Sequence, residues 1–210
     1  AYILDDTVFT WDEVVRESSA RAAILSSMLD PTRPLHIGVL LENTPDYLFW
    51  IGGAALIGAC VVGINPTRRG NELARDVRHT DCQMIITDRI QRQVFDGLDL
   101  GVPHERILEV DSDTHSQLIQ QHRDAPIPTS LFDPTLPLFL LFTSGSTSAP
   151  KAVVCTHARM AVTAVRAGEI YGVTRDQVCY CPMPLFHGNA LMACWGPALA
   201  AGATVVLRRK

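Results

Sequence analysis

Residues 36–64 read HIGVLLENTPDYLFWIGGAALIGACVVGI, and this stretch decides the fold class. It begins with a short apolar run, His36–Leu41, which has the length and composition of a buried strand. Pro45 suits the first turn of a helix, and Gly58 suits its end. The strand-like run Cys60–Ile64 follows directly. A strand, a helix and a second strand in this order are typical of an α/β fold with a largely parallel sheet.

The same stretch holds the chain's one candidate for a membrane span. Residues 47–64 are eighteen consecutive residues without a charge, which just reaches the usual threshold for a spanning helix. Four glycines interrupt the run, and the segments around it follow an α/β pattern. We therefore predict a buried helix that leads into a buried strand, with Asn43 or Thr44 as the helix cap.

Strand and helix patterns alternate along the rest of the chain. Thr10 and Glu13 have the spacing of a capping box at the start of one helix. Residues 122–137 hold four prolines and no clear period, so we expect a joint between two subregions there. The sequence predicts an α/β fold with largely parallel sheets flanked by helices. The other expected strands are 7–10, 83–87, 106–110, 138–142, 153–155, 178–180 and 204–207, and the other expected helices are 11–29, 70–79, 112–121 and 157–171.

Composition places the chain among globular proteins and excludes some functions. Of 210 residues, 47% are apolar and 19% charged, which suffices for a core and is not typical of disorder. The net charge is −4, and no basic stripe is interleaved with aromatic residues, so we expect no nucleic-acid partner. Six cysteines are too sparse for a secreted disulfide scaffold, which favours buried, reduced thiols in a cytosolic protein. Cys179 and Cys181, with His187 nearby, match no common zinc spacing, so we expect no metal site there.

The main functional signal is the stretch 141–154, which reads LFTSGSTSAPKAVV. It follows a predicted buried strand, and ligands in α/β proteins bind beyond the carboxyl ends of such strands. The nucleotide-binding pattern G-x-x-x-x-G-K-[ST] fails here, because Pro150 replaces its second glycine and Ala152 its metal-binding hydroxyl. The nucleophile pattern S-x-x-K at residues 148–151 also fails, because Pro150 disfavours the helical turn that it needs.

What remains is a hydroxyl-lined loop with one lysine. Gly145 permits close approach of an anion, and Lys151 supplies a mobile positive charge. This chemistry suits a polyphosphate, although composition alone leaves an ordinary Ser/Thr-rich surface loop as an equal alternative. The hydroxyl donors are Thr143, Ser144, Ser146 and Thr147.

LFTSGSTSAPKAV resembles the phosphate-loop signature of the adenylate-forming superfamily, which includes acyl-CoA synthetases, luciferases and peptide-synthetase adenylation domains. Ser148 and Ala152 stand where glycine is usual. We expect these two differences to affect the mobility of the loop and the rate of the reaction more than the identity of the motif. PMPLFHGNALM, residues 182–192, is similar to the family's aromatic/histidine motif beside the carboxylate pocket, with His187 as its histidine. Residues 36–80 resemble the family's early region around N-P-x-x-x-x-x-E-L, and ATVVLRRK resembles the fatty-acid transport and very-long-chain acyl-CoA synthetase branch.

The resemblance implies a fatty acid-CoA ligase. A carboxylate attacks the α-phosphate of ATP, giving acyl-adenylate and pyrophosphate, and coenzyme A then displaces AMP. It implies catalytic roles for Lys151 and His187, with magnesium sharing the phosphate charge and no protein metal ligand in this chain. The implied phosphate-binding residues are Thr143, Ser144, Gly145, Ser146, Thr147 and Lys151.

The family's adenine, metal and ribose residues and its C-terminal lysine have no candidate before Lys210, so residues 1–210 are expected to be the N-terminal part of a larger AMP-binding domain. Two alternatives stay open: a non-catalytic fragment or binding module, and, less favoured, a P-loop nucleotide hydrolase. The expected partner is a fatty acid or other carboxylate, in the cytoplasm and with peripheral membrane association. Acyl length, acceptor thiol and oligomeric state are left open by the sequence.

Overall fold

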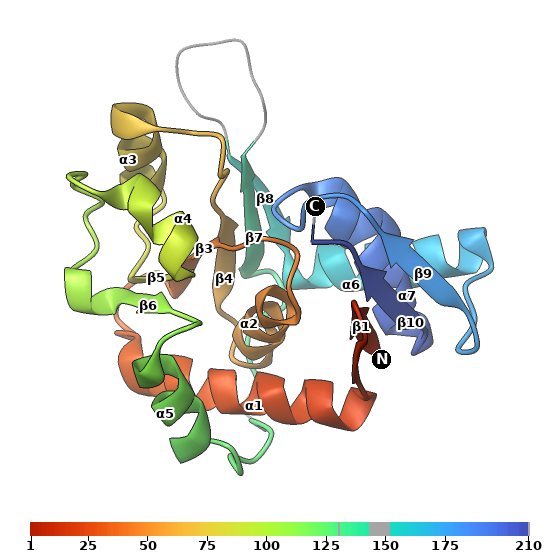
Figure 1. Ribbon diagram of the computed structural model, residues 1–210. Helices are drawn as coiled ribbons and strands as arrows, with labels where there is room; N and C mark the ends of the chain where they lie inside the picture. Colours follow the sequence, from red (N-terminus) through yellow and green to blue (C-terminus); the bar gives the residue numbers. More distant parts are fainter. Residues whose placement is uncertain (130, 143–151, 210) are drawn as a thin grey trace.

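Two β-sheets form the framework of the chain (Figure 1). The computed structural model describes residues 1–129, 131–142 and 152–209. Within these residues, neighbouring strands run parallel except in two pairs. The antiparallel pairs are β1 (Tyr2–Leu4) with β2 (Thr7–Phe9), and β7 (Pro137–Phe142) with β8 (Ala152–Thr156). The predicted α/β class with largely parallel sheets is therefore confirmed.

The middle of the chain builds the larger sheet. Its other strands are β3 (His36–Leu40), β4 (Cys60–Gly63), β5 (Met84–Thr87) and β6 (Ile107–Glu109). The order across the sheet is β6-β5-β3-β4-β7-β8. As the stretch 36–64 predicts, β3 and β4 are parallel neighbours, with His36 opposite Cys60. The connecting segments are α2 (Pro45–Leu56), α3 (Gly70–His79), α4 (Arg89–Arg92), the 3₁₀ turns η1 (Gln93–Phe95) and η2 (His104–Arg106), and α5 (Asp113–Gln121).

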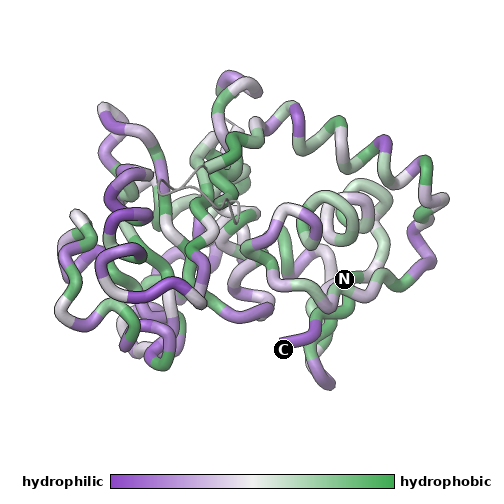
Figure 2. Tube along the Cα trace, turned by 90° about the horizontal axis from the view of Figure 1, so that it is seen from above, coloured by the Kyte–Doolittle hydropathy of each residue, from purple (hydrophilic) through white to green (hydrophobic). Residues whose placement is uncertain are grey.

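The two ends of the chain build the smaller sheet. Its remaining strands are β9 (Val178–Cys181) and β10 (Thr204–Leu207), and its order is β2-β1-β10-β9. Since β1 pairs with β10, the first and last strands of the chain are neighbours in this smaller sheet (Figures 1 and 2). The remaining helical segments are α1 (Trp11–Met28), which packs along α2, and α6 (His157–Tyr171), the π-helical turn η3 (Ala190–Trp195) and α7 (Gly196–Ala201).

One hydrophobic core joins the two sheets. It contains Tyr2 and Val205 from the smaller sheet and Ile37 and Phe139 from the larger one, all at most 1% exposed. The Trp195 indole N–H donates a hydrogen bond of 2.9 Å to the Tyr2 hydroxyl inside this core. Because the core is shared, the two sheets are held in a fixed relation, and a site at their junction has a rigid base.

Local signals place the helix ends where the sequence predicts them. Thr10 and Glu13 form the capping box at the start of α1. Gly58 adopts a positive φ of 71° just after α2, a conformation that glycine takes without strain. The N-cap position of α2 is Thr44, but its side chain makes no capping hydrogen bond. The other predicted cap, Asn43, is used elsewhere, as described below.

Helices α1 and α2 pack closely because α2 carries glycine at the contact. A Cβ at Gly53 would lie 2.7 Å from the Cβ of Arg21 on α1. Arg21 is buried here, ion-paired with Glu17 at 2.6 Å and with Asp46 at 2.5 Å, and its guanidinium lies 5.5 Å from the centre of the Trp50 ring. The apolar stretch 47–64 is thus a buried helix followed by a buried strand, as predicted. No helix in the described ranges has both the length and the apolar character that crossing a membrane requires.

Candidate active site

The carboxyl ends of the parallel strands β3, β4 and β7 meet at one edge of the larger sheet. Phe142 and Ala152, which flank the stretch 143–151 in the sequence, are register partners at this end of the β7–β8 pair. In α/β proteins, ligands bind beyond the carboxyl ends of the parallel strands. The predicted phosphate-binding residues Thr143, Ser144, Gly145, Ser146, Thr147 and Lys151 lie outside the described residues, and their roles stay predictions.

Residues 182–188, the segment that follows β9, lie across these strand ends, and Asn43 binds the segment there through two hydrogen bonds. The Nδ2 of Asn43, just after β3, donates to the carbonyl of Met183 at 2.8 Å. Its Oδ1 accepts from the backbone N–H of Leu185, also at 2.8 Å. Asn43 is only 4% exposed; its hydrogen bond with Leu185 is buried and its hydrogen bond with Met183 is partly buried. Asn43 thus fixes the backbone that leads into His187.

Two glycines let the segment approach the strand ends closely. A Cβ at Gly63, the last residue of β4, would lie 3.2 Å from the backbone oxygen of Phe186. A Cβ at Gly188 would lie 3.1 Å from the Cδ1 of Leu141 on β7. A larger residue at either position would push the segment outward, because these contacts are already tight.

Side chains of this segment line two pockets, and a turn closed by the hydrogen bond from the His187 N–H to the Pro184 carbonyl, 3.0 Å long, lies between them. Pro182 and Phe186 line one pocket, which six polar or charged side chains also line and which we call the polar pocket. Met183 and His187 line the other, which we call the apolar pocket. Pro184 contributes to both walls. The segment is therefore a partition, and its position sets the shape of both pockets.

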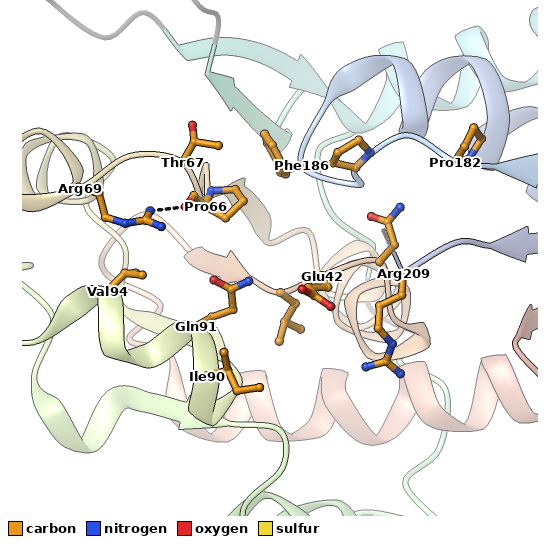
Figure 3. Close-up of a pocket in the computed structure, with 13 residues that line it drawn as sticks. Glu42, Pro66, Thr67, Arg69, Ile90, Gln91, Val94, Pro182, Phe186 and Arg209 are labelled. Atoms are coloured by element: carbon orange, nitrogen blue, oxygen red, sulfur yellow. Dashed lines mark hydrogen bonds between the residues drawn. The ribbon is translucent and has the colours of Figure 1, made fainter.

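The polar pocket has a volume of about 410 Å³ and contains two guanidinium groups (Figure 3). Arg69 reaches in from the start of α3 and donates hydrogen bonds to the carbonyls of Pro66 and Arg68. Arg209 enters from the opposite side, beyond β10. Guanidinium groups pair well with phosphate and carboxylate, so this pocket suits an anionic ligand. Its other lining residues are Leu41, Glu42, Asn43, Pro66, Thr67, Ile90, Gln91, Val94, Pro182, Pro184 and Phe186.

The apolar pocket has a volume of about 580 Å³ and contains His187. The His187 side chain is exposed and its ring centre lies 4.2 Å from that of Phe186. Arg159, from the first turn of α6, is the cationic side chain in the same wall. Burial raises the pKa of the Cys155 thiol, which also lines the pocket and therefore stays neutral. Apolar walls are supplied by Leu141, Phe142, Val153, Val154, Met183 and Met192.

Three of these residues were not identified from the sequence. The sequence identifies Asn43 only as a helix cap, although its position two residues after the predicted strand His36–Leu41 is a usable signal. Arg159 and Arg69 had no signal, because nothing in their local sequence shows which pocket they would reach. Over the parts of the chain that the structure describes, no cluster of three or more His, Cys, Asp or Glu side chains could hold a metal ion.

Fold and site together define an α/β ligand-binding protein whose site lies at the strand ends where two sheets meet. The family profile described as "AMP-binding enzyme" matches residues 1–210, the whole chain. The chain therefore belongs to the AMP-binding enzyme family, and the resemblance to adenylate-forming enzymes is confirmed.

The chain also resembles individual enzymes over nearly all of its length. It is 54% identical over 203 residues to the steroid-22-oyl-CoA synthetase of Rhodococcus jostii, covering 96% of this chain and 36% of that protein. It is 40% identical to the medium/long-chain-fatty-acid–CoA ligase FadD17 of Mycobacterium marinum, covering 98% of this chain and 40% of that protein. The chain thus spans about two fifths of the length of these relatives.

Solved structures show the same fold at low sequence identity. The apo structure of MbtA from Mycobacterium smegmatis matches all of this chain and 41% of its own, with a TM-score of 0.84 and 24% identity. ATP-bound MatB from Rhodopseudomonas palustris matches all of this chain and 42% of its own, with a TM-score of 0.84 and 16% identity. The predicted fold, part of the adenylate-forming architecture, is confirmed by these matches.

Proposed function

We propose that residues 1–210 are the N-terminal part of an acyl-CoA ligase that forms an acyl-adenylate from ATP and then an acyl thioester of coenzyme A. One observation carries this proposal: an apolar pocket holding His187 and Arg159 is lined by the end of β7 at Phe142 and by β8 at Val153, beside the carboxyl ends of the parallel strands. A carboxylic acid with an apolar body and an anionic nucleotide can therefore meet at this edge. Membership of the AMP-binding family, and relatives that are named acyl-CoA synthetases or ligases, support the assignment.

The proposed substrate is a large apolar carboxylic acid. The walls of the apolar pocket suit such a body, while Arg159 and His187 offer polar partners for its carboxylate. Sequence identity favours a steroid side-chain acid first, because the 54% identical relative is named for that substrate, and a medium- or long-chain fatty acid second. We also propose a cytoplasmic location with peripheral contact to membranes, where such acids accumulate.

The mechanism that follows assigns the chain's residues to binding and orientation. Lys151 and the hydroxyls of 143–147 would hold the β- and γ-phosphates and favour the departure of pyrophosphate. His187 would border the attacking carboxylate, and Asn43 would keep the His187 segment in place. Magnesium would come with ATP and share the negative charge of its phosphates. The guanidinium groups of the polar pocket are available for phosphates of ATP or coenzyme A.

Variants of the 143–151 stretch in the full-length enzyme test the proposal. Lys151→Ala removes a cation and Thr147→Ala a donor, so each should lower the rate of pyrophosphate release about 10²–10³-fold if these groups stabilise developing charge. If they only bind ATP, the KM for ATP should rise while kcat holds. Ser148→Gly restores the usual family residue and should leave the rate unchanged or higher. Wild-type ATP parameters in both Lys151→Ala and Thr147→Ala would contradict the proposal and leave a binding module as the better interpretation.

A further inference from the structure

Two thiols bracket the segment that carries His187. Cys181 is the last residue of β9, and Cys194 lies in the π-helical turn η3. The Cys194 thiol donates a hydrogen bond of 3.3 Å to the carbonyl oxygen of Tyr180, the residue next to Cys181, and the Cys181 thiol donates to the carbonyl oxygen of Met183 at 3.8 Å. Both sulfurs therefore lie against the backbone of residues 180–183. Residues 182–193 between them form the partition between the two pockets and the start of η3.

We propose that Cys181 and Cys194 form a reversible disulfide when the protein meets a peroxide, and that this bond makes the pair an oxidative modification site that controls the His187 segment. Both sulfurs belong to elements that pack against each other, so they can approach without unfolding the core. The effect on activity rests on the proposed function, whereas formation of the bond does not.

The environment of the pair favours the reaction. The neighbouring Cys194 thiol lowers the pKa of the Cys181 thiol, and the interaction with Cys181 together with burial raises the pKa of the Cys194 thiol. Cys181 is therefore the thiol of the pair that loses its proton first and acts as the nucleophile. Cys181 is fully buried, but Cys194 is only partly buried and gives a small oxidant access.

The chemistry balances with one peroxide per disulfide. A thiolate of the pair attacks the peroxide O–O bond, giving a sulfenic acid on that sulfur and hydroxide. The other thiol then displaces the sulfenic oxygen as water and forms the S–S bond. Two thiols are oxidised by two electrons, hydrogen peroxide is reduced to two waters, and a dithiol reductant reverses the change.

Cys179 is the competing thiol. It lies two residues before Cys181, so both point to the same face of β9. Burial raises the pKa of Cys179, and the nearby Cys194 raises it further, so Cys179 is the poorer nucleophile. The remaining cysteines, Cys60, Cys82 and Cys155, are buried elsewhere in the fold.

The disulfide would move the His187 segment because it shortens the distance between the sulfurs of Cys181 and Cys194. An S–S bond is about 2.05 Å long, much shorter than the closest approach of two unbonded thiols. Its formation therefore draws η3 toward the end of β9 and shortens the span of residues 182–193. Displacements on the order of 1 Å at a reacting group can cost about 10²-fold in rate, so acyl-CoA formation should fall by about 10- to 100-fold.

Disulfide mapping tests the bond itself. The full-length protein is treated with hydrogen peroxide, alkylated, and cut with chymotrypsin, which separates Cys181 from Cys194 at Phe186 and Leu191. We expect peptides carrying Cys181 and Cys194 to be joined, and to separate after a dithiol reductant. Cys194→Ser, which changes a partly buried side chain, should give no joined peptide. Retention of both free thiols in folded wild type, or a link through Cys179 instead, would overturn the proposal.

Activity measured on the same samples separates this proposal from the proposed function. We expect peroxide to lower acyl-CoA formation in wild type about 10- to 100-fold, reductant to restore it, and Cys194→Ser to resist. If the joined peptide forms but activity is unchanged, control of the His187 segment is refuted. If the reduced protein makes no acyl-CoA, the proposed function fails while the disulfide result stands.

Discussion

The hydrogen bonds of Asn43 give the sharpest prediction for a single residue. Asn43→Ala leaves the carbonyl of Met183 and the N–H of Leu185 without their 2.8 Å partners. An unsatisfied buried polar group costs about 1–3 kcal/mol. Because Met183 is partly exposed and water can reach it, we expect a total loss of about 2–4 kcal/mol in the free energy of unfolding.

Asn43→Asp separates the two bonds. The carboxylate can still accept from the N–H of Leu185, but it cannot donate to the carbonyl of Met183. Burial and this facing carbonyl should raise the folded-state pKa of the introduced carboxyl group above its unfolded value of about 3.9, because only the protonated acid donates again. Stability contributed by the protonated form is thus fully present below the unfolded pKa and is lost as pH rises through the folded pKa. The deficit relative to wild type should therefore shrink as the pH falls.

Urea denaturation of wild type and both variants at several pH values measures these effects. Asn71→Ala is the matched control, because Asn71 is exposed on α3 and its loss should change stability by less than about 0.5 kcal/mol. In the full-length enzyme, Asn43→Ala should also raise the KM for the carboxylic acid more than the KM for ATP. An Asn43→Ala stability equal to that of the control, or an Asn43→Asp deficit that does not vary with pH, would refute the role given to this side chain.

Three further changes test other parts of the structure. His187→Ala should raise the KM for the acid or alter acyl selectivity while the KM for ATP stays unchanged. Pyrophosphate release at varied concentrations of both substrates measures this. A raised KM for ATP with an unchanged KM for the acid would contradict a role for His187 in binding the acid. Gly53→Ala should destabilise the chain by about 1–3 kcal/mol in urea, since the new Cβ meets Arg21 on α1. Burial, and after it the charge of Arg21, lowers the pKa of His115, although Asp46 and Glu17 oppose this shift. As the pH falls, His115 is therefore protonated in the unfolded chain before it is protonated in the folded chain, and the free energy of unfolding should fall below about pH 6.5 by up to about 1.4 kcal/mol per pH unit. His115→Phe should remove this contribution to the pH dependence of urea denaturation.

Much of the fold could be predicted because its signals are local. The bounds of α3 and α6 agree with the prediction residue for residue, and Thr10, Pro45 and Gly58 mark helix ends through their own backbone and capping chemistry. The strand β1 was missed because three residues carry no periodicity, and it is a strand only through pairing with β10 at the other end of the chain. The segments η3 and α7 were missed because their residues are all apolar or glycine, so no polar face contrasts with an apolar one.

Site residues that stand in a local motif could be predicted, and those that depend on contacts between distant segments could not. His187 could be singled out because it stands in a specific motif, and the structure places it in the apolar pocket. The bonds of Asn43 join residues about 140 positions apart, and no local pattern encodes such a contact. Arg159 contributes through the direction in which α6 leaves β8, which depends on packing between the sheets.

Product analysis on the full-length protein tests the central proposal most directly. The protein is incubated with ATP, magnesium, coenzyme A and either a steroid side-chain acid or a long-chain fatty acid, and AMP, pyrophosphate, ADP, phosphate and acyl-CoA are quantified. We predict AMP, pyrophosphate and acyl-CoA in equal amounts, only when an acid is present, and with the steroid acid used better than the fatty acid. ADP and phosphate released without regard to the acid, or no nucleotide turnover with any acid, would contradict the assignment as an AMP-forming acyl-CoA ligase.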